Sequence, residues 1–183
     1  MAVSSFAGGF GGVVPPGDNT VLVAGIGNVF LGDDGFGPEV VRHLAARRPA
    51  LPDGVRAVDY GIRGMHLLYD LLTGYEALVI VDALPGRGRP GEVVVLEVGP
   101  ADLERLGGDF DPHGMNPVAV LAGLPALGGE LPPTYVVGAA PENLEEGIGL
   151  TATLTAAVAP AGARVRDLLA TRPWALARTA RQV

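Results

Sequence analysis

Five short apolar runs, rich in β-branched residues, most constrain what this chain can fold into. They have the length and composition of β-strands and lie at residues 21–26, 55–58, 77–81, 93–98 and 134–138. Apolar residues at helical spacing follow several of these runs, at residues 39–46, 64–72, 117–127 and 152–170. Strands that alternate with helices indicate an α/β fold, with a largely parallel sheet that is covered by helices on both faces.

The fourth apolar run departs from this alternation. Residues 93–98 follow the third run after a turn-rich segment, PGRGRPGE, and no helical pattern lies between the two. We therefore expect one antiparallel strand at an edge of the sheet.

The length of the chain, 183 residues, suits one domain. Residues 1–18 are rich in glycine and end near a Pro-Pro-Gly turn, so they are predicted to form a flexible extension. Residues 19–171 are predicted to form the folded domain. Residues 172–183 contain three arginines and are expected to be a solvated tail.

Composition excludes several kinds of partner and chemistry. The formal net charge is −7 and no basic block is present, which argues against a nucleic-acid partner. Cysteine is absent, so disulfides, thiolate metal ligands and a cysteine nucleophile are excluded. No apolar run reaches the ~18 residues of a membrane-spanning helix and no signal-peptide pattern opens the chain. We therefore expect a cytoplasmic protein with no membrane partner.

The loop after the first apolar run, GNVFLGDDGFG, combines glycines with two adjacent acids. Its glycines begin a dinucleotide-binding pattern, but the third glycine of that pattern would fall on Phe30, and a pyrophosphate would face two carboxylates. This disfavours the alternative of a nucleotide-binding oxidoreductase or transferase. Pro38 suits the first turn of the next helix, so one of Asp33 and Asp34 is expected to cap that helix. Capping does not require both acids.

Two further polar residues are expected near the carboxyl ends of the strands, where α/β folds bind their ligands. Asp82 ends the apolar run VIVDAL, at the carboxyl end of a buried strand, and is either a structural acceptor of backbone hydrogen bonds or a functional group. His113 lies in FDPHGMNP, where Asn116 and Pro117 can already begin the following helix. His113 is therefore either a surface residue or available for chemistry.

Asp34, Asp82 and His113 can meet in one cleft if the loops converge at the carboxyl edge of the sheet. Two carboxylates and one imidazole suit a divalent cation such as nickel or zinc. Three protein ligands also leave coordination positions open for a substrate. No local metal-binding motif joins the three residues, so their spacing alone does not establish a metal site.

The same residues occur in segments that resemble the hydrogenase maturation protease family. The resemblance runs from about residue 21 to about residue 165 and rests on GIGNVFLGDDGFG, VIVDAL, DPHGMNP and GAAPENLEEGIGLTATLTAAV. It implies a three-layer αβα sandwich around a twisted, mostly parallel sheet. It also implies that Asp34, Asp82 and His113 are the metal-binding and catalytic residues.

The resemblance further implies an endopeptidase that removes the C-terminal extension from the large-subunit precursor of a nickel-iron hydrogenase. The nickel is supplied by the precursor, and no resident organic cofactor is expected. Hydrolysis would use a metal-polarised carbonyl or water with a carboxylate as base. The alternative is a non-catalytic nickel carrier or scaffold for hydrogenase assembly that uses the same three residues.

Two positions depart from the family pattern. Some members have glutamate where this chain has Asp34, a change between hard oxygen donors that differ by one methylene. The segment DYGIRGM, which begins at Asp59, lacks the glycine-glycine-threonine of other members. This departure leaves the role of Asp59 open and is consistent with a different partner hydrogenase.

Overall fold

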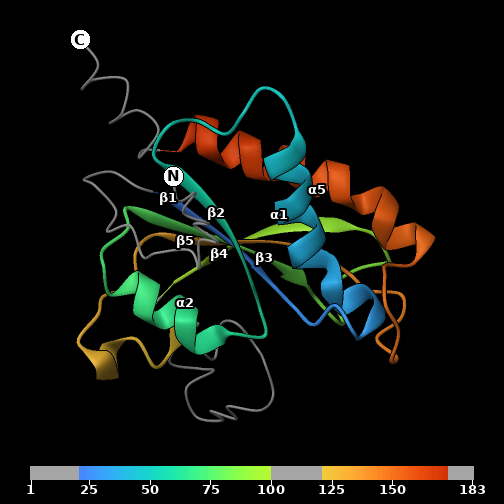
Figure 1. Cartoon of the computed structure of the whole chain (residues 1–183), viewed down its shortest axis with the longest axis horizontal. Coiled ribbons are helices and arrows are strands. Elements are labelled where there is room, and N and C mark those ends of the chain that lie inside the picture. Colours follow the sequence, from blue (N-terminus) through green and yellow to red (C-terminus); the bar gives the residue numbers. More distant parts are fainter. Residues whose placement is uncertain (1–20, 100–120, 173–183) are drawn as a thin grey trace, which may run out of the picture.

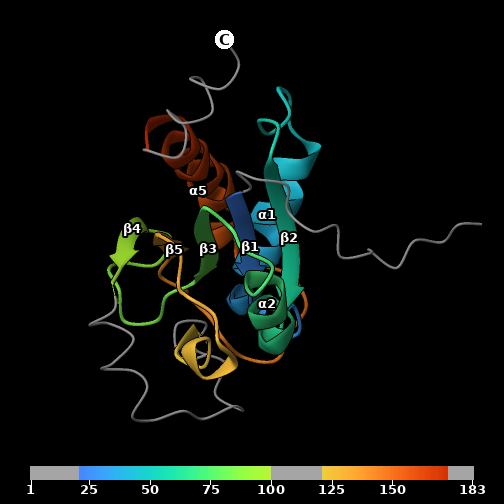
Figure 2. The same cartoon turned by 90° about the vertical axis from the view of Figure 1, so that its left-hand side faces the viewer.

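The computed structural model describes residues 21–99 and 121–172, which form a five-stranded sheet with helices on both faces (Figures 1 and 2). The strands are β1 (Val21–Ile26), β2 (Val55–Gly61), β3 (Ala77–Ala83), β4 (Val93–Val98) and β5 (Thr134–Ala139). The α-helices are α1 (Phe36–Ala46), α2 (Gly64–Leu71) and α5 (Ala152–Thr171), and the 3-10 helices are η1 (Gly32–Gly35) and η3 (Pro125–Leu127).

The strands follow the order β2-β1-β3-β5-β4 across the sheet. The first four of these run parallel, and β4 runs antiparallel to β5 at one edge. The predicted mostly parallel sheet and its antiparallel edge strand are therefore confirmed. Although β4 follows β3 in the chain, β5 lies between them.

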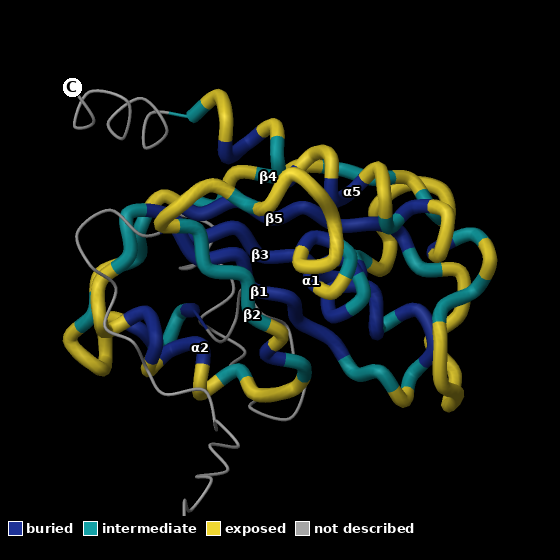
Figure 3. The backbone as a smooth tube through the Cα atoms, turned by 45° about the horizontal axis from the view of Figure 1, so that its top comes forward, coloured by how far each residue is buried: buried dark blue, intermediate teal, exposed yellow. Residues whose placement is uncertain are grey.

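Two apolar clusters cover the two faces of the sheet, and each draws on alternate residues of the strands. Val21 and Val23 of β1 face the cluster that contains α1 and α5, whereas Leu22 and Ala24 face the cluster that contains α2. Figure 3 shows the central strands buried along their length between these layers. The result is the three-layer αβα arrangement implied by the resemblance.

Helix α1 begins directly against the carboxyl ends of two strands. A Cβ atom on Gly37 would lie 2.2 Å from the carbonyl oxygen of Val81 in β3 and 2.3 Å from that of Ile26 in β1. Only a residue without a side chain permits this approach. The contact fixes the loop between β1 and α1 over the carboxyl edge of the sheet, where Asp33 and Asp34 lie in η1.

The predicted helices at residues 39–46, 64–72 and 152–170 correspond to α1, α2 and α5. The predicted helix at 117–127 falls partly outside the described residues, and its last three residues form η3. The predicted extension and nearly all of the predicted tail also lie outside them. In the described ranges, no helix is both long enough and apolar enough to cross a membrane.

Candidate active site

Three segments that are distant in sequence meet at the carboxyl edge of the sheet. They are the loop between β1 and α1, the end of β3, and the loop between β5 and α5. Figure 1 shows the two loops at the lower right, in blue and orange. The first and last of these are joined by backbone hydrogen bonds, from Gly147 N to Phe30 O and from Gly32 N to Gly147 O, both 2.9 Å. The two loops therefore form one ordered surface beside the strand ends.

Asp33 holds these loops together from within. Its side chain is fully buried and accepts hydrogen bonds from the backbone N–H groups of Glu142, Asn143 and Thr151, at 2.9, 3.0 and 2.7 Å. The Thr151 hydroxyl donates a fourth, at 3.1 Å. Burial raises the pKa of Asp33, but these donors outweigh it and leave the pKa below its ordinary value. Asp33 is thus a charged crosslink between the loops.

This arrangement corrects the expected helix cap. Helix α1 begins after Gly35, and neither it nor η1 has a hydrogen bond from its backbone to a capping side chain. Asp33 cannot cap α1 because its oxygens already accept hydrogen bonds from the loop before α5. The capping prediction considered only neighbours in sequence, whereas the partners of Asp33 lie 109 to 118 residues further along the chain.

Asp34 lies beside Asp33 but faces a different environment. It is partly exposed, and its Oδ2 accepts a hydrogen bond from the backbone N–H of Asn28 at 2.6 Å. The chain turns sharply to allow this contact: Gly27 has a φ of 132°, and a Cβ there would lie 1.8 Å from the carbonyl oxygen of Asp34. Gly27 therefore has to be glycine for the Asp34 carboxylate to take this position.

Asp82 is the second-to-last residue of β3 and pairs in register with Gly138 of β5. Its side chain is 6% exposed, and the described residues give it one hydrogen bond, from the backbone N–H of Ala83 to Oδ1 at 2.9 Å. Burial raises the pKa of Asp82 well above its ordinary value, and the negative charge of Asp34 raises it further. The structure therefore brings Asp34 and Asp82 close enough for their charges to interact.

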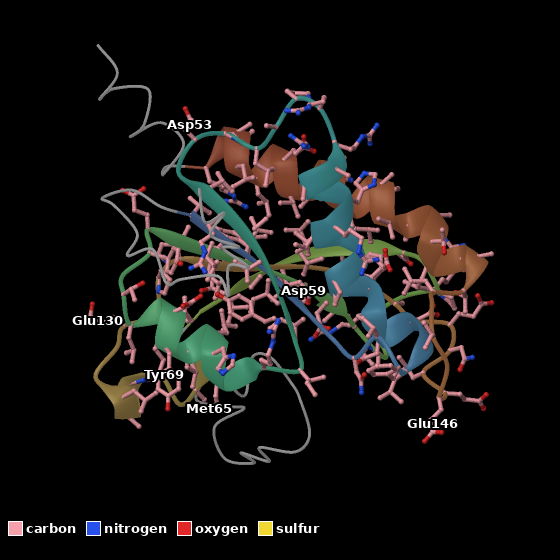
Figure 4. The ribbon with its side chains drawn as sticks, viewed as in Figure 1. Asp53, Asp59, Met65, Tyr69, Glu130 and Glu146 are labelled. Carbon is pink, nitrogen blue, oxygen red and sulfur yellow. The ribbon has the colours of Figure 1, made fainter. Side chains whose placement is uncertain are left out.

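The third predicted residue, His113, lies outside the described residues. Within residues 21–99 and 121–172, no group of three or more acidic or imidazole side chains is arranged to hold a metal ion. Asp59 lies at the same edge of the sheet, beside Gly25 in the β1–β2 register, and its side chain is exposed (Figure 4). The described part of the predicted site is thus the pair Asp34 and Asp82.

Comparison with known proteins identifies the family. The family model for hydrogenase maturation proteases of the HycI type matches residues 38–167. The hydrogenase 2 maturation protease of Escherichia coli is 37% identical over 145 residues, which cover 77% of this chain and 85% of that protein. The chain belongs to the hydrogenase maturation protease family. This membership decides against the nucleotide-binding alternative.

Solved structures of family members share the fold of this maturation protease. The hydrogenase maturating endopeptidase HybD from E. coli superposes with a TM-score of 0.70 and 34% identity, over 82% of this chain and 91% of that one. The hydrogenase 2 maturation peptidase from a Thaumarchaeota archaeon gives a TM-score of 0.62 and 31% identity, over 84% and 99%. The maturation protease is accordingly a peptidase. The residue types in its sequence limit which catalytic groups it can use.

The sequence contains few of the commonest peptidase nucleophiles. The maturation protease has no cysteine, and its two serines, Ser4 and Ser5, precede the first strand by more than ten residues. A nucleophile elbow of the G-x-S-x-G type is therefore absent from the sequence.

Proposed function

We propose that this protease removes the C-terminal extension from the nickel-loaded large-subunit precursor of a nickel-iron hydrogenase, and that it recognises the nickel of its substrate. The observation that carries the proposal is the meeting of Asp34 and Asp82 at the carboxyl edge of the sheet, in a chain of the hydrogenase maturation protease family. Ligand sites of open α/β sheets lie at this edge.

The two carboxylates suit a substrate that presents a divalent cation. Asp82 is buried with one hydrogen bond from the described residues, and Asp34 adds a second negative charge nearby. A cation placed between the carboxylates offsets both their repulsion and the cost of burying a charge. In the proposal, His113 supplies an imidazole ligand, which completes a set of oxygen and nitrogen donors that suits nickel.

Nickel recognition gives the protease a means of distinguishing loaded from unloaded precursor. A precursor without nickel would bring no positive charge to the acid pair, whereas the loaded precursor brings the cation that favours the charged form of both acids. Docking through the metal also places the scissile peptide beside the acids. We assign Asp34 and Asp82 to metal contact and to activation of the attacking water.

The test is an incubation of the purified protease with its cognate large-subunit precursor, prepared with and without nickel. The intact mass of the precursor is then measured. The proposal predicts that the C-terminal peptide is lost from the loaded form only. Cleavage of both forms would remove nickel recognition from the proposal, and cleavage of neither would favour the nickel carrier or scaffold.

A further inference from the structure

An exposed apolar surface lies next to the proposed site, on the two loops that Asp33 joins. It consists of Phe30, Leu144 and Ile148, whose side chains are 63%, 41% and 83% exposed. Ile148 is the most exposed large apolar side chain of the described residues. Isolated apolar side chains are common on protein surfaces, but a group of them on adjoining loops marks an interaction site. We call this group the apolar rim.

The backbone holds the apolar rim in place. Leu31 and Gly147 form a parallel β-bridge, so the chain around Phe30 runs beside the chain around Ile148. Each loop is also tightened by an asparagine side chain: Asn28 Oδ1 accepts from Phe30 N at 3.0 Å, and Asn143 Oδ1 accepts from Glu145 N at 2.8 Å. A surface ordered in advance loses less conformational entropy when a partner binds.

Negatively charged side chains lie on the same loop as Leu144 and Ile148 of the apolar rim. Glu142, Glu145 and Glu146 are all exposed, and none of them takes part in the salt bridges found among the described residues. The two loops, residues 27–37 and 140–151, contain no arginine or lysine. The charge that would complement this surface is therefore positive.

The apolar rim is linked to the site through the backbone at Asp33 and Asp34. Asp33, which clamps the loop of Ile148, is the immediate neighbour of Asp34. We propose that the apolar rim and its glutamates dock a segment of the hydrogenase precursor that carries both apolar and basic side chains, and so determine which precursor reaches Asp34 and Asp82. This inference rests on the proposed function.

The test compares matched variants at opposite ends of the molecule. Figure 4 places Glu146 far from Glu130, which follows η3 and is likewise exposed. Ile148→Ser and Glu146→Arg alter the proposed docking surface. The controls Leu127→Ser and Glu130→Arg make corresponding changes in η3 and three residues after it, and Leu127 is 43% exposed. All four variants are expected to keep the thermal midpoint of the wild type, because each changes an exposed side chain.

Processing of the nickel-loaded precursor is then measured at several precursor concentrations. Ile148→Ser is expected to raise KM about tenfold with kcat within about twofold, because loss of a docking anchor weakens binding without touching the chemistry. Glu146→Arg is expected to raise KM about threefold, and the effect should shrink at high salt. An unchanged KM in both variants, or an equal rise in the η3 controls, would overturn the docking surface while the proposed function stands.

Direct binding separates the two proposals if the wild type cleaves neither form of the precursor. Surface plasmon resonance with the immobilised precursor would then show a loss of about tenfold in affinity for Ile148→Ser against wild type if the docking surface is real. Equal affinities, or no binding by the wild type, would overturn it.

Discussion

Two buried aspartates at one edge of the sheet, Asp33 and Asp82, are held in opposite ways. Asp33 accepts four hydrogen bonds and has a lowered pKa, whereas Asp82 accepts one from the described residues, lies near another carboxylate and has a raised pKa. A buried charge that is fully hydrogen-bonded stabilises the loops around it. A buried carboxyl group with a single described hydrogen bond and a second carboxylate nearby is costly to ionise, and in the proposed function the metal of the substrate offsets that cost.

The largest expected effect lies at the poorly hydrogen-bonded aspartate. Asp82→Asn should lower processing of the nickel-loaded precursor by more than about 100-fold, because the amide cannot supply the negative charge for metal contact or water activation. The precursor's intact mass over time measures it. Asp53→Asn is the matched control, since Asp53 precedes β2 at the other end of the sheet (Figure 4), and it should process normally. If Asp82→Asn processed the precursor as fast as Asp53→Asn, Asp82 would not be needed for the reaction and its contrast with Asp33 would fail.

Substitution of Asp33, which accepts four hydrogen bonds, should mainly lower the stability of the fold. Asp33→Ala is expected to lower the free energy of unfolding by about 3 kcal/mol, because three backbone N–H groups and one hydroxyl lose their shared acceptor. Urea denaturation followed by circular dichroism measures this change. A loss of less than about 1 kcal/mol would mean that the loops are held by their backbone contacts alone.

Thr151 allows a smaller test of the same crosslink. Its hydroxyl donates to Asp33 and also accepts from the backbone N–H of Leu154 as the N-cap of α5. Thr151→Val should therefore cost about 1 to 2 kcal/mol of unfolding free energy in urea denaturation. Thr155→Val, an exposed position in the same helix, is the control and should change it by less than about 0.5 kcal/mol. Equal effects of the two changes would assign the loss to helix propensity instead.

A third buried carboxylate, Asp70, extends the comparison to the far side of the sheet. It accepts hydrogen bonds from Tyr60 Oη and from Arg56 Nη1. Burial, and then the hydrogen bond to Asp70, raise the pKa of Tyr60 above its ordinary value. The unfolded chain therefore loses this proton first as pH rises above about 10, and the stability of the fold should decline from there.

Removing the Tyr60 hydroxyl tests this smallest effect. Tyr60→Phe should cost about 1 kcal/mol at neutral pH and should flatten the decline in unfolding free energy between about pH 10 and 12. Urea denaturation across this pH range measures both. A decline as steep as that of the wild type would show that other groups cause it.

Most of the fold could be predicted from apolar patterns, because β1, β3 and β5 are buried along their whole length and the edge strands β2 and β4 are still apolar runs. The predicted bounds of β1 and β4 match the structure. The strands β2 and β3 extend beyond their apolar runs because sheet pairing carries Asp59 and Asp82 into the ladder. Helix α1 begins three residues earlier than its pattern, since η1 leads directly into it and Phe36 is buried.

The candidate site was predictable only in part. The end of an apolar run locates Asp82, and the loop motif locates Asp34, because both signals are local. The role of Asp33 depends on backbone donors that are more than a hundred residues away in the sequence, and a local sequence pattern cannot predict hydrogen bonds of this kind. The part that His113 plays in the site stays a prediction.

The unfolding free energy of Asp82→Asn at pH 7 tests the central claim most directly, because it asks whether this buried acid serves the fold. The amide keeps an oxygen for the Ala83 N–H and cannot ionise beside Asp34. The account predicts a stability equal to the wild type or higher by up to about 1 kcal/mol. A loss of more than about 2 kcal/mol would make Asp82 a structural residue like Asp33 and contradict the account.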